Sequence, residues 1–210
     1  MYFAIEGVIG VGKTTLARLL QPAFEANLLL EVFEENPFLS SFYGDRALYA
    51  FQTQMFFLLS RYRQQNNAVP TLLKEPHHLI SDYTFAKDSL FARINMKGDE
   101  LEMYFRLHEA LAEKIPTPDL MVYLRAETRT LMQRIAMRDR PYERSMEQNY
   151  IQELNEAYDD YFINQKLNMP VLIVDSNNLD FVRNPDDLSW IENRIRQMLQ
   201  LPPYQPALPM

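Results

Sequence analysis

A glycine-rich segment near the beginning of the chain has the residues of a phosphate-binding loop. Residues 7–14 read Gly-Val-Ile-Gly-Val-Gly-Lys-Thr, a complete match to G-x-x-x-x-G-K-[ST]. In such a loop the backbone N–H groups point at a phosphate chain, the lysine reaches the β- and γ-phosphates, and the threonine hydroxyl binds Mg²⁺. The pattern therefore predicts a nucleoside triphosphate site. Its residues are Gly7, Gly10, Gly12, Lys13, Thr14 and Thr15.

Two carboxylates lie in or directly after apolar runs that are typical of strands. Glu31 lies in the run 28–33, and Asp82 directly follows Leu-Ile-Ser at 79–81. A carboxylate that ends a strand beside a phosphate loop can anchor Mg²⁺ directly or through water. Asp82 could instead cap the following helix, and Glu31 could be a solvated residue at a sheet edge. The residues alone leave both choices open.

Arginines gather at positions 134, 138, 140 and 144. Arg134 and Arg138 are four residues apart and share a helix face. Because Asp139 and Glu143 lie among them, the segment fits a salt-bridged surface. It equally fits a lid that closes arginines over phosphates.

A second helical segment, 51–61, carries polar groups among aromatic residues. Gln54 and Arg61 are seven residues apart, so both point the same way. They could recognise the edge of a base by paired hydrogen bonds, or they could belong to the solvent-facing polar side of an amphipathic helix.

Apolar runs alternate along the chain with helical patterns. The runs span 2–5, 28–33, 77–81, 120–124 and 171–174, and the helical patterns span 13–25, 45–66, 83–95, 98–114, 127–138, 147–166 and about 186–200. This alternation predicts an α/β fold of the P-loop NTPase type, in three layers, with a parallel five-stranded sheet and helices on both faces. Ligands of such sheets bind beyond the carboxyl ends of the strands.

The expected domain organisation is simple. We expect one P-loop domain over residues 1–200 with an arginine-rich lid around 134–146, and a Pro-rich tail over 201–210. Pro70 is interpreted as part of a loop.

The composition excludes several classes of protein. The chain has 210 residues, 47% of them hydrophobic, a net charge of -7 and no cysteine. The negative net charge argues against a nucleic-acid polymer or an anionic membrane as the main partner. If such a chain binds phosphates, its Lys and Arg side chains must gather locally. Neither a signal peptide nor a membrane span is recognisable, which makes the cytoplasm the expected location.

The order of these motifs resembles the deoxyribonucleoside kinase family over nearly the whole chain. The family's Glu-Pro-Val triplet reads Glu31-Val32-Phe33 here, and the bacterial Asn-Pro-aromatic-Leu…Phe-Tyr stretch is matched over 36–43. The Gln…Leu-Ser-Arg pattern is matched over 54–61, and the lid pattern Arg-x-x-x-Arg-x-Arg-x-x-Glu is complete over 134–143.

The resemblance implies a role for each matched residue. Glu31 would take the proton of the nucleoside 5′-hydroxyl, and Thr14 with Asp82 would hold Mg²⁺. Lys13, Arg134 and Arg138 would act on the phosphates of ATP, with Asp180 and Phe181 flanking its adenine. The acceptor nucleoside would be contacted, besides Glu31, by Tyr43, Gln54, Phe57, Arg61, Asp88, Arg140 and Glu143.

One position departs from the family. The arginine that follows the metal-binding carboxylate is Tyr83 here. That arginine helps to hold the 5′-hydroxyl and the phosphates, so we expect another residue, for example a lid arginine, to take its role.

An Arg61–Asp88 pair donates to ring acceptors and accepts from an exocyclic amino group. It therefore favours deoxyadenosine or deoxyguanosine, with deoxycytidine next.

The leading hypothesis is an ATP- and Mg²⁺-dependent, homodimeric kinase that phosphorylates the 5′-hydroxyl of a deoxynucleoside in nucleotide salvage. One alternative is a nucleoside monophosphate kinase, whose acceptor site would need basic residues in place of Glu31. Another is a binding module that ATP switches with little transfer, which Tyr83 favours.

Overall fold

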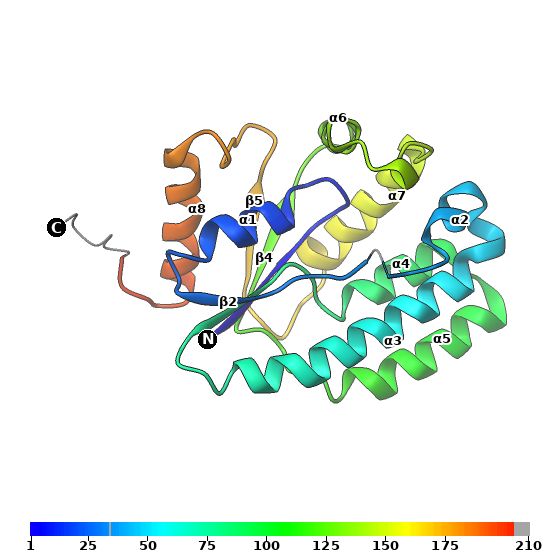
Figure 1. Cartoon of the computed structure of the whole chain (residues 1–210), viewed down its shortest axis with the longest axis horizontal. Coiled ribbons are helices and arrows are strands. Elements are labelled where there is room, and N and C mark those ends of the chain that lie inside the picture. Colours follow the sequence, from blue (N-terminus) through cyan, green and yellow to red (C-terminus); the bar gives the residue numbers. More distant parts are fainter. Residues whose placement is uncertain (34, 204–210) are drawn as a thin grey trace.

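The computed structural model describes residues 1–33 and 35–203, and within them five strands form a single parallel sheet in the order β2-β3-β1-β4-β5 (Figure 1). The strands are β1 (Tyr2–Glu6), β2 (Ala26–Leu29), β3 (His78–Ser81), β4 (Leu120–Arg125) and β5 (Val171–Asp175). Every residue of β1 is buried, as a central strand covered on both faces requires. The predicted α/β class with a five-stranded parallel sheet is confirmed.

Helices cover both faces of the sheet. They are α1 (Lys13–Leu20), α2 (Leu39–Gly44), α3 (Arg46–Leu72), α4 (Lys87–Asn95), α5 (Gly98–Ala112), α6 (Thr128–Arg138), α7 (Gln148–Asp159) and α8 (Pro185–Met198). α1 and α8 contact each other on one side, whereas α3, α4, α5 and α7 pack together on the other (Figure 1). None of the helices described is both long and apolar enough to cross a membrane.

The core is rich in aromatic side chains on both sides of the sheet. The Phe3 ring of β1 packs edge-on against Phe24 at 5.0 Å between centroids, and the Tyr123 ring of β4 stacks on Phe162 at 4.9 Å. Leu16 and Leu20, four residues apart on α1, are fully buried and hold that helix against the sheet. This packing fixes the start of α1, where the glycine loop ends.

The second strand ends earlier than the sequence indicates. β2 covers Ala26–Leu29 instead of 28–33. Its neighbour β3 ends at Ser81, so the backbone beyond Leu30 has no strand to pair with. The N–H of Glu31 donates to the Asp82 side chain instead, at 2.8 Å. This turn away from the sheet brings Glu31 into the site.

Some helix boundaries also differ from the prediction. α2 was not expected, and Pro70, interpreted as a loop residue, lies inside α3. Helix α3 continues past this proline because Val69 is fully buried against the core and accepts the N–H of Leu73 at 3.0 Å. The segment predicted as a helix over 83–95 becomes helical only at Lys87. The predicted helix 147–166 divides into α7 and a π-helical turn, Asp160–Asn164.

Candidate active site

The glycine loop between β1 and α1 has a backbone that only glycine accommodates readily. Gly10 and Gly12 have φ of +87° and +108°. A Cβ on Gly10 would lie 2.7 Å from Cγ1 of Ile135 on α6, and a Cβ on Gly12 would lie 3.1 Å from the Phe181 ring. Both the conformation and the close approach of neighbouring elements therefore require glycine here.

Lys13 folds back over this loop. Its Nζ donates to the carbonyl oxygens of Gly7 at 2.7 Å and of Val8 at 3.2 Å. Burial lowers the pKa of Lys13 to about 8, and the nearby charge of Lys87 adds to the effect. The ammonium group is still mostly protonated at neutral pH, and it stands where a phosphate chain would replace its carbonyl partners.

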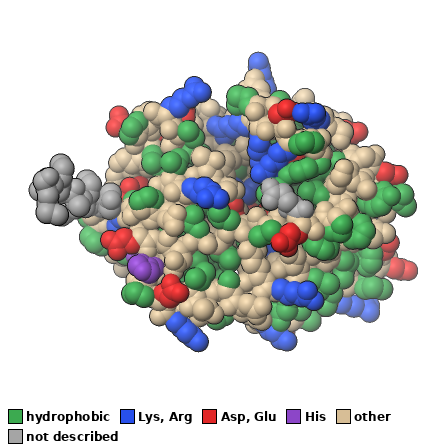
Figure 2. Space-filling view, viewed as in Figure 1, with side chains coloured by type: hydrophobic (Ala, Val, Ile, Leu, Met, Phe, Trp, Pro, Cys, Tyr) green, Lys and Arg blue, Asp and Glu red, His purple; other side chains and the backbone are tan. Residues whose placement is uncertain are grey.

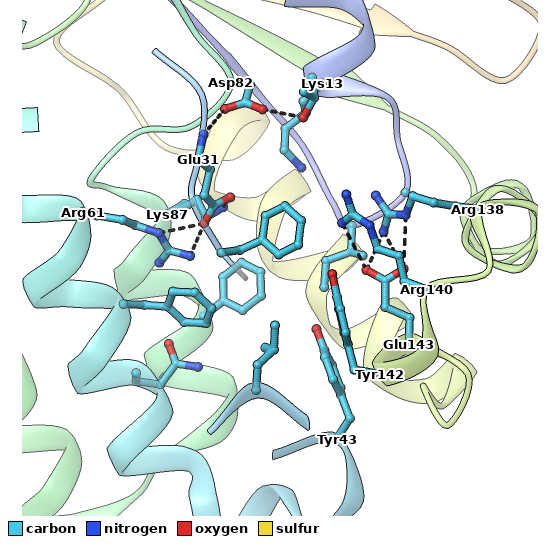
Figure 3. A pocket seen from close by; sticks show the side chains of 18 of the residues that line it. Lys13, Glu31, Tyr43, Arg61, Asp82, Lys87, Arg138, Arg140, Tyr142 and Glu143 are labelled. Carbon is cyan, nitrogen blue, oxygen red and sulfur yellow. Dashed lines mark hydrogen bonds and ion pairs between the residues drawn. The ribbon is translucent and has the colours of Figure 1, made fainter. Parts of the chain in front are cut away.

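Asp82, at the end of β3, joins the glycine loop to the Glu31 turn. One carboxylate oxygen accepts from the Thr14 hydroxyl, and the other accepts from the Glu31 N–H (Figure 3). A hydroxyl beside a carboxylate is a donor set that suits Mg²⁺, which commonly takes its remaining ligands from phosphates and water. Among the described residues no group of three or more acidic, His or Cys side chains could hold a metal ion.

Glu31 is held between two cations. Its Oε1 accepts from Arg61 Nε at 2.9 Å, and its Oε2 accepts from Lys87 Nζ at 2.6 Å (Figure 3). Burial by itself raises the pKa of this carboxyl, but the Arg61 and Lys87 charges outweigh it and hold the pKa well below its ordinary value. Glu31 is therefore ionised. Arg61 also forms an ion pair with the fully buried Asp88.

A cavity extends from these groups toward α3 and the loop after α6. Tyr43, Gln54 and Phe57 line it together with Glu31 and Arg61. The Gln54 side-chain oxygen is buried and has no hydrogen-bond partner among the described residues. An orphaned acceptor of this kind is costly unless a ligand or water satisfies it. On this face of the molecule Lys and Arg side chains gather in and beside a hollow (Figure 2), although the chain is acidic overall.

The loop after α6 closes the cavity on the side opposite Glu31. Buried Glu143 accepts from Arg138 Nη2 at 2.6 Å, and Arg140 lies 3.7 Å from the same carboxylate. The Tyr142 ring stacks on Tyr43 at 6.3 Å between centroids (Figure 3). The structure therefore brings Arg138, Arg140 and Glu143 to the cavity, where the sequence placed them.

Arg134 occupies a different place from Arg138. Its guanidinium donates to the carbonyl oxygens of Val11 at 3.2 Å and of Ser176 at 2.7 Å. It lines a second hollow, on the outer side of the glycine loop, with Thr15, Asp180 and Phe181. Four residues predicted to bind the donor nucleotide, two at its phosphates and two at its adenine, thus line one hollow.

The family model for deoxynucleoside kinases matches residues 3–200. The chain belongs to the deoxynucleoside kinase family. The predicted resemblance is confirmed, and with it the prediction that the chain is a kinase.

Relatives of this kinase match it over most of their length. A deoxyguanosine kinase of Bacillus subtilis is 35% identical over 202 residues, which cover 94% of this chain and 97% of the relative. A deoxyadenosine kinase of Dictyostelium discoideum is 31% identical over 193 residues, or 90% of this chain and 76% of the relative. The solved structure of a deoxyadenosine kinase from M. mycoides with bound dATP has a TM-score of 0.81 and 25% identity, and the match covers 93% of this chain and all of that one.

The position that departs from the family has a defined structural role in this kinase. Tyr83 is fully buried, and its hydroxyl donates to Gln64 Oε1 at 2.6 Å. Gln64 in turn donates to the carbonyl oxygen of Leu30 at 2.8 Å. Gln64 of α3 therefore connects Tyr83 to the residue before Glu31. Lys87 lies against Glu31, whereas Arg138 and Arg140 of the predicted lid lie with Glu143. The expectation that a lid arginine takes the role of the missing arginine stays a prediction.

Lys87 is the main residue of the site that sequence reasoning missed. It directly precedes Asp88, which was singled out, and it is the only lysine between positions 75 and 96. The sequence shows that a lysine stands here, but not which way its side chain points. Residues 82–86, which direct Lys87 toward Glu31, are irregular backbone and have no periodicity from which a direction could be predicted. Phe33 and Tyr142, which also line the cavity, were missed for the same reason.

Proposed function

We propose that this kinase transfers the γ-phosphoryl group of ATP to the 5′-hydroxyl of a purine deoxynucleoside, with Mg²⁺ as cofactor. Deoxyguanosine and deoxyadenosine are the favoured acceptors, with deoxycytidine next. The observation that carries the proposal is the ionised Glu31, held at the wall of a cavity that Lys13, Thr14 and Asp82 also line. The names of the relatives, deoxyguanosine kinase and deoxyadenosine kinase, support the purine preference.

The donor nucleotide is assigned to the glycine loop. In this proposal the loop N–H groups and Lys13 hold the β- and γ-phosphates, and Thr14 and Asp82 hold Mg²⁺. The ion would neutralise charge on the phosphates as the γ-group leaves. Thr15, Arg134, Asp180 and Phe181 line the hollow that would receive the rest of ATP. Arg134, bonded to the Val11 and Ser176 carbonyls, then acts by fixing the loop and not by closing over the phosphates.

The acceptor hydroxyl is assigned to Glu31. In the transfer the 5′-oxygen forms a bond to the γ-phosphorus, the bond from that phosphorus to the β-phosphate oxygen breaks, and the hydroxyl proton moves to Glu31. Because phosphoryl transfer is largely dissociative, the base acts mainly by orienting the hydroxyl and accepting its proton late. The charges of Arg61 and Lys87 hold the pKa of this carboxyl low, so Glu31 stays ionised and can accept a hydrogen bond from the hydroxyl. The low pKa also makes Glu31 a weak base, which fits a role mainly in orienting the hydroxyl.

The base of the nucleoside is assigned to α3 and its neighbours. Gln54, with its orphaned side-chain oxygen, would accept from an amino or ring N–H group of the base. The Arg61–Asp88 pair adds donors and an acceptor, and Phe57, whose ring lies 4.3 Å from the Arg61 guanidinium carbon, packs beside them. Tyr43 and Glu143 face the same cavity and would hold the sugar.

Two further features belong to the proposal. Residues 134–146 act as a lid, in which Arg138 and Arg140 exchange part of their pairing with Glu143 for the phosphates. A homodimer is expected from the family resemblance, and exposed Leu59 on α3 and Met103 on α5 are available for it. The tail over 201–210 lies outside the described residues from position 204 onward.

The test is a panel of acceptors incubated with ATP and Mg²⁺. Deoxyguanosine and deoxyadenosine should give monophosphate with a higher kcat/KM than deoxycytidine, and thymidine should be poorest. A deoxynucleoside monophosphate serves as the competing acceptor. Formation of a diphosphate from it, with no product from the four nucleosides, would contradict the proposal and favour a monophosphate kinase. ATP binding without transfer to any acceptor would favour a nucleotide-switched binding module.

A further inference from the structure

Lys87 lies deep in the active site at the first residue of α4. Its side chain is buried, 5% exposed, and its Nζ lies 2.6 Å from Glu31 Oε2. It lines the same cavity as Lys13 and Thr14 (Figure 3), and its charge is felt at Lys13. A lysine ammonium is strongly hydrated in water, so burying it is unfavourable unless the site uses its charge.

Lys87 belongs to a cluster of four directly paired charged side chains, and the formal charges of this cluster balance only because Lys87 is present. Glu31 and Asp88 are the anions of the cluster, and Arg61, which pairs with both of them, is its other cation. Without Lys87 the cluster would carry a net negative charge next to the place where phosphates arrive. The buried ammonium therefore balances Glu31 before the reaction, while Asp88 balances Arg61.

The other residues that could supply this charge are engaged elsewhere in the described structure. Tyr83, at the position of the family's arginine, carries no positive charge, and its hydroxyl donates to Gln64. Arg138 and Arg140 lie with Glu143 on the opposite side of the cavity (Figure 3). Lys87 is thus the cation that the segment between β3 and α4 contributes, five residues after Asp82 on the same turn of chain.

We propose that Lys87 is a second catalytic lysine, which holds the Glu31 carboxylate toward the acceptor hydroxyl and then neutralises the transferred phosphoryl group. The inference rests on the proposed function. As the 5′-oxygen bonds to phosphorus and its proton moves to Glu31, that carboxylate becomes neutral. The Lys87 charge is then no longer balanced by Glu31 and faces the phosphoryl group while the bond to the β-phosphate oxygen breaks. Lys13 serves the donor phosphates, and Lys87 serves the acceptor side.

The test compares Lys87→Met, Lys87→Gln and Lys87→Arg with the exposed control Lys97→Met. Lys87→Met removes the charge, Lys87→Gln keeps a hydrogen-bond donor without charge, and Lys87→Arg keeps the charge. We expect both neutral variants to lose about 10²-fold or more in kcat, whereas Lys87→Arg recovers at least about a tenth of the wild-type rate. Dissociation constants for ATP and for the deoxynucleoside, measured by calorimetry, should change by less than about three-fold, because the charge acts mainly in the transition state.

Chemical rescue separates a catalytic charge from a structural one. A Lys87→Ala variant should regain activity as methylammonium is added, in proportion to its concentration, and Lys97→Met should show neither loss nor rescue. If Lys87→Gln keeps a kcat within about three-fold of wild type, or if no cation restores any neutral variant, the proposal is overturned. Either of these two outcomes would overturn the role of Lys87 alone, and the proposed function would stand as long as the wild type phosphorylates deoxynucleosides. A wild-type enzyme that phosphorylates none of them would overturn the proposed function and this proposal together.

Discussion

Replacing Glu31 with glutamine is the sharpest test of how this site works. The change keeps the shape of the side chain and leaves one oxygen to accept from Arg61 Nε, now at 2.9 Å. It removes the negative charge, and it places an amide N–H₂ group where Oε2 accepts from Lys87 at 2.6 Å. Two donors then face each other in a buried place, and the proton acceptor proposed for the reaction is gone.

The structure allows the two consequences to be estimated separately. Loss of a general base costs about 10²–10⁴-fold in kcat, which is ~2.7–5.4 kcal/mol in the activation barrier. The stability effect is smaller. Lys87, buried and left without its partner, should lower the free energy of unfolding by about 1–3 kcal/mol, and Arg61 keeps its ion pair with Asp88.

The assay is monophosphate formation under saturating ATP and nucleoside, with urea unfolding of the same samples. Glu35→Gln, an exposed change four residues along the same loop, is the matched control and should leave both quantities unchanged. A Glu31→Gln enzyme that is folded, binds ATP normally and keeps a kcat within about three-fold of wild type would refute the assignment of Glu31 as the base.

Three further changes test other parts of the structure. Gly10→Ala places a Cβ 2.7 Å from Cγ1 of Ile135 at φ +87°. We expect ATP affinity, measured by calorimetry, to fall at least about ten-fold, and the free energy of unfolding, measured in urea, to fall by about 1–3 kcal/mol. Asp88→Asn should lower kcat/KM for purine deoxynucleosides by about ten-fold or more while thymidine changes less; equal losses in the acceptor panel would count against base recognition by this pair. Burial by itself raises the pKa of Asp159, but hydrogen bonds from Arg125 and Tyr123 outweigh it and hold the pKa below its ordinary value. The Asp159 carboxylate therefore stabilises the fold at a pH above its unfolded-state pKa. This stabilisation is lost as the pH falls through the folded-state pKa. Asp159→Asn should therefore cost about 1–2 kcal/mol in urea unfolding at neutral pH, and the difference from wild type should shrink as the pH falls through the folded-state pKa of Asp159.

The sequence by itself was enough to predict the class of fold and the glycine loop that is proposed to bind the donor. The glycine loop is local: its spacing, the strand before it and the helix after it are all contained in residues 2–20. Alternation of apolar runs and helical patterns was enough to predict a parallel sheet, and the position of Asp82 at the end of β3 placed it beside the loop. These features depend on periodicity and on the reach of a few neighbouring residues, which a single chain displays directly.

The tertiary structure decided which charged side chains face one another. The order β2-β3-β1 places the end of β2 next to Asp82, and this ends the strand at Leu29 and turns Glu31 inward. Packing of α3 against α4 then sets Arg61 and Lys87 on the two oxygens of that carboxylate. Such pairings join Glu31, in irregular backbone, to helix residues 30 and 56 positions away, and they are stable because burial makes an unpaired charge costly. That cost depends on the folded environment as a whole, so no spacing in the sequence reveals it.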